Sequence, residues 1–217
     1  MTAVPAYPRW VRFGIKPIVF LGCLTPFVLL ARGAVVGDLG ANPLDRVTDV
    51  TGEWGLRFVL LTLAVTPLRQ LTGIVFFQRF RRMLGLFAFF YVSLHFLTWV
   101  WLDQSFVLQN IFADIAKRPF VTVGFLAWLL LTPLALTSTR GMMRRLGRRW
   151  QQLHRLIYVI GLLGILHYLW LVKADLLEPL LYALLLLLLL GLRWPPLSRR
   201  LQAFGKRRNR AGQSEFA

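Results

Sequence analysis

The stretch "LHRLIYVIGLLGILHYLWLV", residues 153–172, decides the fold. It is twenty residues long, and an arginine near its start is its one permanently charged side chain. A helix needs about 20 predominantly apolar residues to cross the roughly 30 Å hydrocarbon core of a bilayer. The stretch therefore predicts a membrane-crossing helix, and it holds two of the chain's three histidines, His154 and His167.

Apolar blocks of similar length recur along the chain, in which 57% of the residues are hydrophobic. A soluble domain is about 45–50% apolar. The blocks lack the polar–apolar alternation of barrel strands, and the other structure that satisfies backbone polar groups in lipid is the helix. The sequence thus predicts an all-α integral membrane protein, a six-transmembrane-helix bundle. The other five predicted spans run from Pro17 to about Val36, Trp54 to Leu71, Met83 to Leu102, Pro119 to Thr137, and Leu177 to Trp194.

The net charge of +17 is distributed by topology. If the N-terminus lies inside, 20 of the 26 basic residues fall on the inner side, and eight of the nine acidic residues fall outside. This is the positive-inside pattern, so we expect both termini to be cytoplasmic and the basic residues to contact anionic lipids rather than nucleic acid. The predicted division is a cytoplasmic N-terminus (1–16), a six-helix transmembrane domain (17–194) and a basic cytoplasmic tail (195–217). The first apolar block also resembles a secretory signal, but we expect it to remain as the first span.

Soluble redox and nucleotide-binding motifs are not found in the sequence. Cys23 is the single cysteine, which excludes a disulfide framework, a Cys-x-x-Cys pair and a covalent haem motif. Neither a Gly-x-Gly-x-x-Gly fingerprint nor a P-loop is present, and no convincing internal repeat is visible.

Two of the three histidines occur at matched depth in spans that run in the same direction. His95 precedes Asp103 by eight residues, and His167 precedes Asp175 by eight, so each lies roughly 12 Å inward of an outer charge. Ionisable residues inside spans are costly and tend to be functional. Two facing imidazoles would supply both axial ligands of a b-type haem. The alternative is a neutral histidine bonded to a neighbouring helix.

His154 lies about 20 Å nearer the predicted inner side than His167. A second haem there would need a partner near Arg81 or Arg82, where the sequence has no histidine. The inner position thus leaves three alternatives: another ligand type, a five-coordinate iron, or no haem. On an ideal helix the two histidines also point some 140° apart, which a π-bulge or a bend near Gly161 and Gly164 would correct.

Further residues near the histidines are candidates for supporting roles. An iron-bound imidazole donates its other N–H to an acceptor, and Ser93, Thr98 and Tyr158 are near enough in sequence to be considered. The alternative for each of the three, which we favour, is ordinary helix packing. Arginines on the inner side could pair with haem propionates or with lipid headgroups. These are Arg81, Arg82, Arg148, Arg149 and Arg155.

The chain resembles the MsrQ family, the haem-bearing membrane subunits of bacterial methionine sulfoxide reductase systems. The matching stretches are "GANPLDRVTDVTGEWGLRFVLLTLAVTPLR", "RRMLGLFAFFYVSLHFLTWV", "LTSTRGMMRRLGRRWQQLHRLIYV" and "LHYLWLVK", between about residues 40 and 173. The wider ferric-reductase-like family uses two histidines on each of two helices to hold two haems. This sequence keeps His95, His154 and His167 and lacks the fourth.

The resemblance implies an electron-transfer subunit with one or two b-type haems in the bacterial inner membrane. Electrons would come from the quinol pool or from a separate flavin reductase. They would pass to the periplasmic molybdenum-cofactor protein MsrP, which would itself reduce methionine sulfoxide in proteins. The resemblance also implies FMN, although no residue can be assigned to it from the sequence. The flavin and nicotinamide domain of the wider family is not present in this sequence, so we expect that this chain alone does not oxidise cytoplasmic NADPH.

Two other classes of function remain open from the sequence. One is a quinol- or flavin-coupled ferric reductase or cytochrome b with a different acceptor. The other is a non-redox membrane scaffold or transporter, although the spans hold few acidic residues and show no inverted repeat of broken helices.

Overall fold

A computed structural model describes residues 14–172 and 175–198, together with residues 201 and 203. All regular elements within these residues are helical, as predicted. Most of the predicted N-terminal segment and of the predicted basic tail lies outside the described residues. The elements in chain order are α1 (Lys16–Val36), α2 (Pro43–Thr72), the 3₁₀ helix η2 (Val75–Arg79), α3 (Arg81–Thr98), the π-helix η3 (Trp99–Asp103), α4 (Leu108–Lys117), α5 (Pro119–Leu136), α6 (Arg140–Leu146), α7 (Arg148–Leu153), α8 (Leu156–Leu171) and α9 (Leu177–Gly191).

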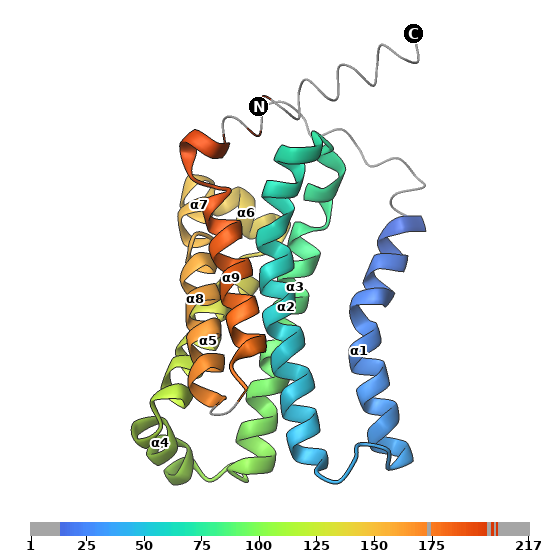
Figure 1. Ribbon diagram of the computed structural model, residues 1–217, viewed down its shortest axis with the longest axis vertical. Helices are drawn as coiled ribbons and strands as arrows, with labels where there is room; N and C mark the ends of the chain where they lie inside the picture. Colours follow the sequence, from blue (N-terminus) through green and yellow to red (C-terminus); the bar gives the residue numbers. More distant parts are fainter. Residues whose placement is uncertain (1–13, 173–174, 199–200, 202, 204–217) are drawn as a thin grey trace.

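The long helices run side by side along the long axis of the molecule, with α1 at one edge (Figure 1). The short helix α4 lies at one end, which we call the acidic end because Asp103 and Asp114 are found there (Figure 1). The helices α6 and α7 lie at the opposite end, here called the basic end because they carry Arg140, Arg144 and Arg148 (Figure 1).

Four helical stretches of the described chain are long and apolar enough to cross a membrane: Lys16–Val36, Arg81–Asp103, Pro119–Leu136 and Arg148–Leu171. The helix α9 is apolar but only 15 residues long, and the 30 residues of α2 include several charges. An all-helical membrane protein is therefore confirmed. The count of six crossings and the inward orientation of both termini stay predictions.

The helix α2 begins at Pro43, eleven residues before the predicted start at Trp54. The predicted start was that of the apolar block, and Asp45 and Asp49 lie before it. Proline at the first helical position and a left-handed Gly73 at the C-terminal end are typical helix boundaries. At 1.5 Å per residue α2 is about 45 Å long, which exceeds the hydrocarbon core. Its first turns, which carry Asp45 and Asp49, lie toward the acidic end (Figure 1).

Aromatic rings from α2 and α3 form much of the core. Phe58 stacks on Tyr91 with 5.3 Å between ring centroids and on Phe87 with 5.6 Å. Tyr91 is fully buried. Offset stacking of this kind adds about 0.5–1.5 kcal/mol beyond the burial of apolar area. The pair of helices that carries His95 is therefore rigidly packed.

The hydroxyl of Tyr91 also attaches α1 to this core. It accepts a hydrogen bond from the backbone N–H of Phe27 (3.0 Å) and donates one to the backbone carbonyl of Cys23 (2.9 Å). The hydroxyl is thus inserted between two groups that would otherwise bond each other within α1, next to Pro26. Cys23 is buried, as expected for a small core residue.

Candidate functional site

His95 and His167 face one another across the bundle. His95 lies on α3 and His167 on α8, and their ring centroids are 6.0 Å apart with the ring planes inclined at 81°. The matched depth predicted from the two outer aspartates thus corresponds to direct proximity of the rings.

Each of these two imidazoles is held by a backbone carbonyl of a neighbouring helix. His95 Nδ1 lies 3.0 Å from the carbonyl oxygen of Thr48 on α2, and His167 Nδ1 lies 2.7 Å from that of Phe120 on α5. A carbonyl oxygen can only accept, so Nδ1 carries the hydrogen and donates it. In the neutral ring Nε2 then keeps its lone pair, which is the tautomer that binds a metal.

A glycine lies against each of the two rings. A Cβ atom added at Gly52 would lie 3.0 Å from His95 Nδ1, and one added at Gly124 would lie 2.8 Å from His167 Nδ1. Either side chain would push the imidazole off its carbonyl. Both glycines follow the bonded carbonyl by four residues, one helical turn. Glycine at these positions lets the ring approach the neighbouring backbone.

The two half-sites are built with the same spacing. His95 and His167 are 72 residues apart, as are Gly52 and Gly124. Their carbonyl partners, Thr48 and Phe120, are also 72 residues apart. The helix pair α2–α3 thus corresponds to the pair α5–α8. Sequence reasoning missed both glycines and both carbonyls, and a search for histidine and glycine at equal spacing would have found them.

None of the three candidate acceptors is bonded to a histidine, which agrees with the alternative of ordinary helix packing. Ser93 accepts a bond from the indole N–H of Trp128 (3.1 Å), and Thr98 donates to the backbone of its own helix (2.9 Å). Tyr158 bonds Arg193 instead of a histidine. Helix-packing roles account for all three residues.

The pair of rings fits an iron porphyrin better than a bare metal ion. A histidine nitrogen binds a metal at about 2 Å, and the ring centre lies about 1 Å behind that nitrogen, so two axial imidazoles on one iron have centroids about 6 Å apart. The observed 6.0 Å agrees with this separation. Among the described residues, no three His, Cys, Asp or Glu side chains converge as metal ligands. A porphyrin brings its own four nitrogens, so two protein ligands are sufficient.

His154 lies apart from this pair, at the basic end. The helix that was predicted to be continuous ends at Leu153 and restarts at Leu156, so His154 lies in the turn between α7 and α8. His154 and Arg155 keep right-handed backbone angles, so the interruption is a short turn within the stretch Arg148–Leu171, before Gly161 and Gly164. The ring stacks on Trp150, with 3.9 Å between centroids.

The imidazole of His154 acts as a donor through Nε2. Nε2 lies 3.2 Å from the hydroxyl oxygen of Thr137. That hydroxyl donates its own hydrogen to the carbonyl of Pro133 at 2.6 Å, so it can only accept from His154. His154 thus carries its hydrogen on Nε2, whereas His95 and His167 carry theirs on Nδ1 and leave Nε2 free.

His154 lines a partly open cavity of about 190 Å³ whose lining includes two arginine side chains. Arg81 and Arg82 contribute these side chains from the start of α3, and Gln78 of η2 adds an amide. Of the five arginines considered from the sequence, Arg81 and Arg82 line this cavity. Arg82 precedes His154 by 72 residues, so it holds the position that corresponds to His154 in the first helix pair.

Known proteins resemble the chain over most of its length. Residues 51–165 match the family described as "Ferric reductase like transmembrane component". The "Protein-methionine-sulfoxide reductase heme-binding subunit MsrQ" of Xanthomonas campestris pv. campestris (strain 8004) is 60% identical over 163 residues, which are 75% of each chain. The protein of the same name from Rhodospirillum rubrum is 57% identical over 84% of this chain and 88% of its own, and that of Herminiimonas arsenicoxydans is 49% identical over 89% of each.

No solved structure matches the chain. The assignment of the chain to a family therefore depends on its sequence similarity to these relatives and on the matching family. The matched residues 51–165 include Gly52, His95 and His154. On these grounds the chain belongs to the MsrQ family of heme-binding subunits, within the ferric-reductase-like transmembrane proteins.

Proposed function

We propose that this chain is a b-type haem electron-transfer subunit of a protein-methionine-sulfoxide reductase system. One observation carries the proposal: His95 and His167 face each other at 6.0 Å, each with Nδ1 bonded to a carbonyl and Nε2 left for iron. Haem, when bound, supplies one-electron transfer. The protein holds the two rings in place and surrounds them with apolar helices. The names of the relatives support haem as the cofactor.

Spectra of the purified, detergent-solubilised chain test the ligand assignment. We expect His95→Ala and His167→Ala each to abolish the low-spin b-type spectrum in reduced-minus-oxidised difference measurements. Size-exclusion chromatography checks that the variants remain monodisperse, and His154→Ala serves as a matched histidine control that keeps the spectrum. A normal low-spin spectrum in either of the first two variants would contradict the proposal.

We place residues 17–194 in the bacterial inner membrane, with the basic end toward the cytoplasm. The distribution of arginines at α6 and α7 supports this orientation through the positive-inside rule. The facing histidines then lie nearer the periplasm than His154 does. Electrons from the quinol pool or a cytoplasmic flavin reductase would therefore enter near His154 and leave near His95 and His167.

We further propose that the cavity at His154 binds the second cofactor, and that this cofactor is FMN rather than a second haem. Three observations favour FMN. Nε2 of His154 is engaged as a donor to Thr137, Arg82 stands where a second histidine would be needed, and Arg81 and Arg82 provide paired cations for a phosphate. Trp150, already stacked on His154, provides an aromatic surface beside the cavity.

Cofactor analysis separates these alternatives. We expect about one haem per chain by pyridine haemochrome titration and one releasable flavin, measured by its fluorescence after denaturation. Arg81→Gln and Arg82→Gln should lower the flavin content and leave the haem content unchanged. Two haems per chain with no flavin would contradict the FMN assignment but not the ligand role of His95 and His167.

The electron acceptor is proposed to be the periplasmic molybdenum-cofactor reductase MsrP, in which methionine sulfoxide would be reduced. The word "subunit" in the names of the relatives supports a partner of this kind. Expression of the chain in a bacterium that lacks its own homologue should restore repair of oxidised periplasmic methionine only when MsrP is present. Repair without MsrP, or no repair with it, would contradict this partner.

A further inference from the structure

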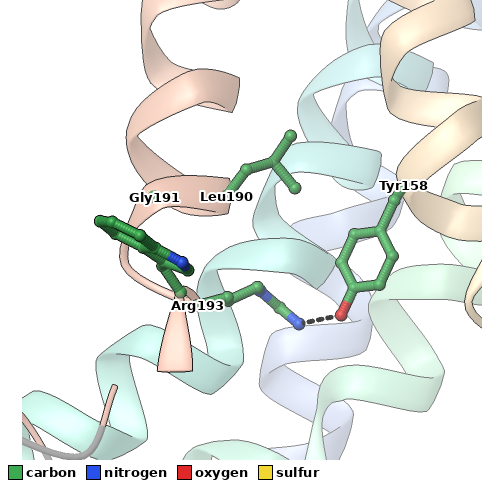
Figure 2. Close-up of a pocket in the computed structure, with 5 residues that line it drawn as sticks. Tyr158, Leu190, Gly191 and Arg193 are labelled. Carbon is green, nitrogen blue, oxygen red and sulfur yellow. Dashed lines mark hydrogen bonds between the residues drawn. The ribbon is translucent and has the colours of Figure 1, made fainter. Parts of the chain in front are cut away.

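A second hollow, separate from the two histidine sites, opens on the outside of the bundle between α8 and α9. It has a volume of about 590 Å³ and is lined by Tyr158, Leu190, Gly191, Arg193 and Trp194. Figure 2 shows the guanidinium of Arg193 reaching across this groove to the hydroxyl of Tyr158. The groove lies at the basic end of α9, and the exposed residues one turn before it, Leu187 and Leu188, are apolar. We call it the α8–α9 groove.

Arg193 is anchored inside the groove by two hydrogen bonds. It donates to the hydroxyl of Tyr158 (2.6 Å) and to the backbone carbonyl of Leu63 on α2 (2.5 Å). The helical partner of that carbonyl would be residue 67, which is proline and has no N–H. The Nε atom of Arg193 is buried and has no partner. The guanidinium is thus fixed in position with donors still unused.

The charge of Arg193 is not neutralised by protein in the described part of the chain. The ion pairs found there join Arg57 to Glu53 and Glu178, and Arg118 to Asp114, toward the acidic end. Arg193 is instead close enough to another cation, Arg81, to act on it electrostatically. A partly buried guanidinium beside a like charge is stabilised by a counter-anion.

We propose that the α8–α9 groove binds the phosphate of an anionic phospholipid. Arg193 is the cation that holds it, and Tyr158, whose oxygen accepts from Arg193, still has its own hydroxyl hydrogen to donate. Trp194, which is 68% exposed, is the type of residue that lies at headgroup level. Basic pockets between helices on the inner side of a membrane are suited to anionic headgroups.

The position of the groove distinguishes this site from the cofactor cavity. Arg81 and Arg82 line the cavity at His154, whereas Arg193 lines the groove, which is more open to the surroundings of α8 and α9. A lipid can enter the groove laterally from the bilayer.

Tryptophan quenching by brominated lipids tests the proposal. The full chain is reconstituted in phosphatidylcholine vesicles. About a fifth of the lipid is brominated, as phosphatidylglycerol in one sample and as phosphatidylcholine in the other. Subtracting the spectrum of Trp194→Phe isolates the contribution of Trp194. Trp101→Phe gives the matched control, because Trp101 is similarly exposed (62%) at the acidic end.

We expect brominated phosphatidylglycerol to be enriched about fivefold over phosphatidylcholine at Trp194, since one such cation contributes about 1 kcal/mol, with no preference at Trp101. Arg193→Gln should abolish the preference. Tyr158→Phe, which leaves the bond from Arg193 to Leu63 intact, should reduce it. Equal quenching by the two lipids at Trp194 would overturn the proposal. So would an unchanged preference in Arg193→Gln, because it would show general attraction to the basic end rather than a site.

Discussion

The two ends of the bundle use histidine in opposite ways. At His95 and His167 a backbone carbonyl takes the Nδ1 hydrogen, and Nε2 is left free. At His154 the hydroxyl of Thr137 takes the Nε2 hydrogen, and the corresponding position of the other helix pair holds Arg82. At the level of His95 and His167, the bundle thus presents two nitrogens that can bind a metal. At the level of His154, it presents one hydrogen-bonded imidazole together with arginine side chains. The hydrogen-bond acceptor beside each ring, rather than the histidine alone, decides which cofactor chemistry is available.

The largest expected effect comes from filling the space beside a facing histidine. Gly124→Val would place a side chain within 2.8 Å of His167 Nδ1 and displace the ring. We expect the haem content to fall about tenfold or more, as for loss of other groups that orient a metal ligand. Gly22→Val is the control, because no atom lies within 4 Å of a Cβ there. Normal haem content in Gly124→Val would show that the close contact is not needed.

Arg82→His would test the correspondence between the two helix pairs. If residues 72 positions apart are equivalent, the new imidazole faces the cavity opposite His154. We expect haem content to rise from about one toward two per chain when haem is supplied in excess, and flavin content to fall. Arg82→Gln should lose flavin without gaining haem. A haem content that stays at that of the unmodified chain would argue against the equivalence.

Thr137→Val would have a smaller effect, confined to the basic end. It removes the acceptor of the His154 Nε2 hydrogen bond. One hydrogen bond contributes about 1 kcal/mol, so we expect about a fivefold weaker affinity for the cofactor bound in that cavity. Flavin titration of the cofactor-depleted protein measures the change. The low-spin haem spectrum should be unaltered, and a shift in it would mean that the two sites are coupled.

Ser93→Ala should have the smallest effect. Ser93 was a candidate partner of a histidine but accepts its bond from Trp128. We expect at most about 1 kcal/mol of destabilisation in denaturant unfolding. The reduced-minus-oxidised spectrum should remain that of the unmodified protein. A spectral change comparable to that of a histidine variant would restore Ser93 as a ligand-orienting residue.

The proximity of His95 and His167 could be predicted because depth along a helix follows directly from residue counting. Both histidines were placed eight residues before an outer aspartate, and both helices run in the same direction. The lengths of the apolar blocks were sufficient to predict the helical class, because the thickness of a bilayer sets the length of a helix that crosses it. These inferences need only the rise of a helix and the thickness of a membrane.

The hydrogen-bond partners of the histidines and the exact helix boundaries depended on contacts between helices. Counting residues along one helix does not predict such contacts. The first turns of α2 carry Asp45 and Asp49, so a search for apolar spans does not include them, although they provide the carbonyl of Thr48. Backbone acceptors have no side-chain signature, so the carbonyls of Thr48 and Phe120 could not be singled out, and side-chain hydroxyls such as that of Ser93 were considered instead. The turn at His154 was also unexpected, because no proline or glycine directly flanks it.

The 72-residue spacing has a consequence for how the protein forms. Each helix pair provides one imidazole, one carbonyl and one glycine, so neither pair by itself can complete the proposed coordination of the iron. The proposed haem would then add a link between the two helix pairs to the direct bond from Trp128 to Ser93, so loading of the cofactor and assembly of the protein would favour each other.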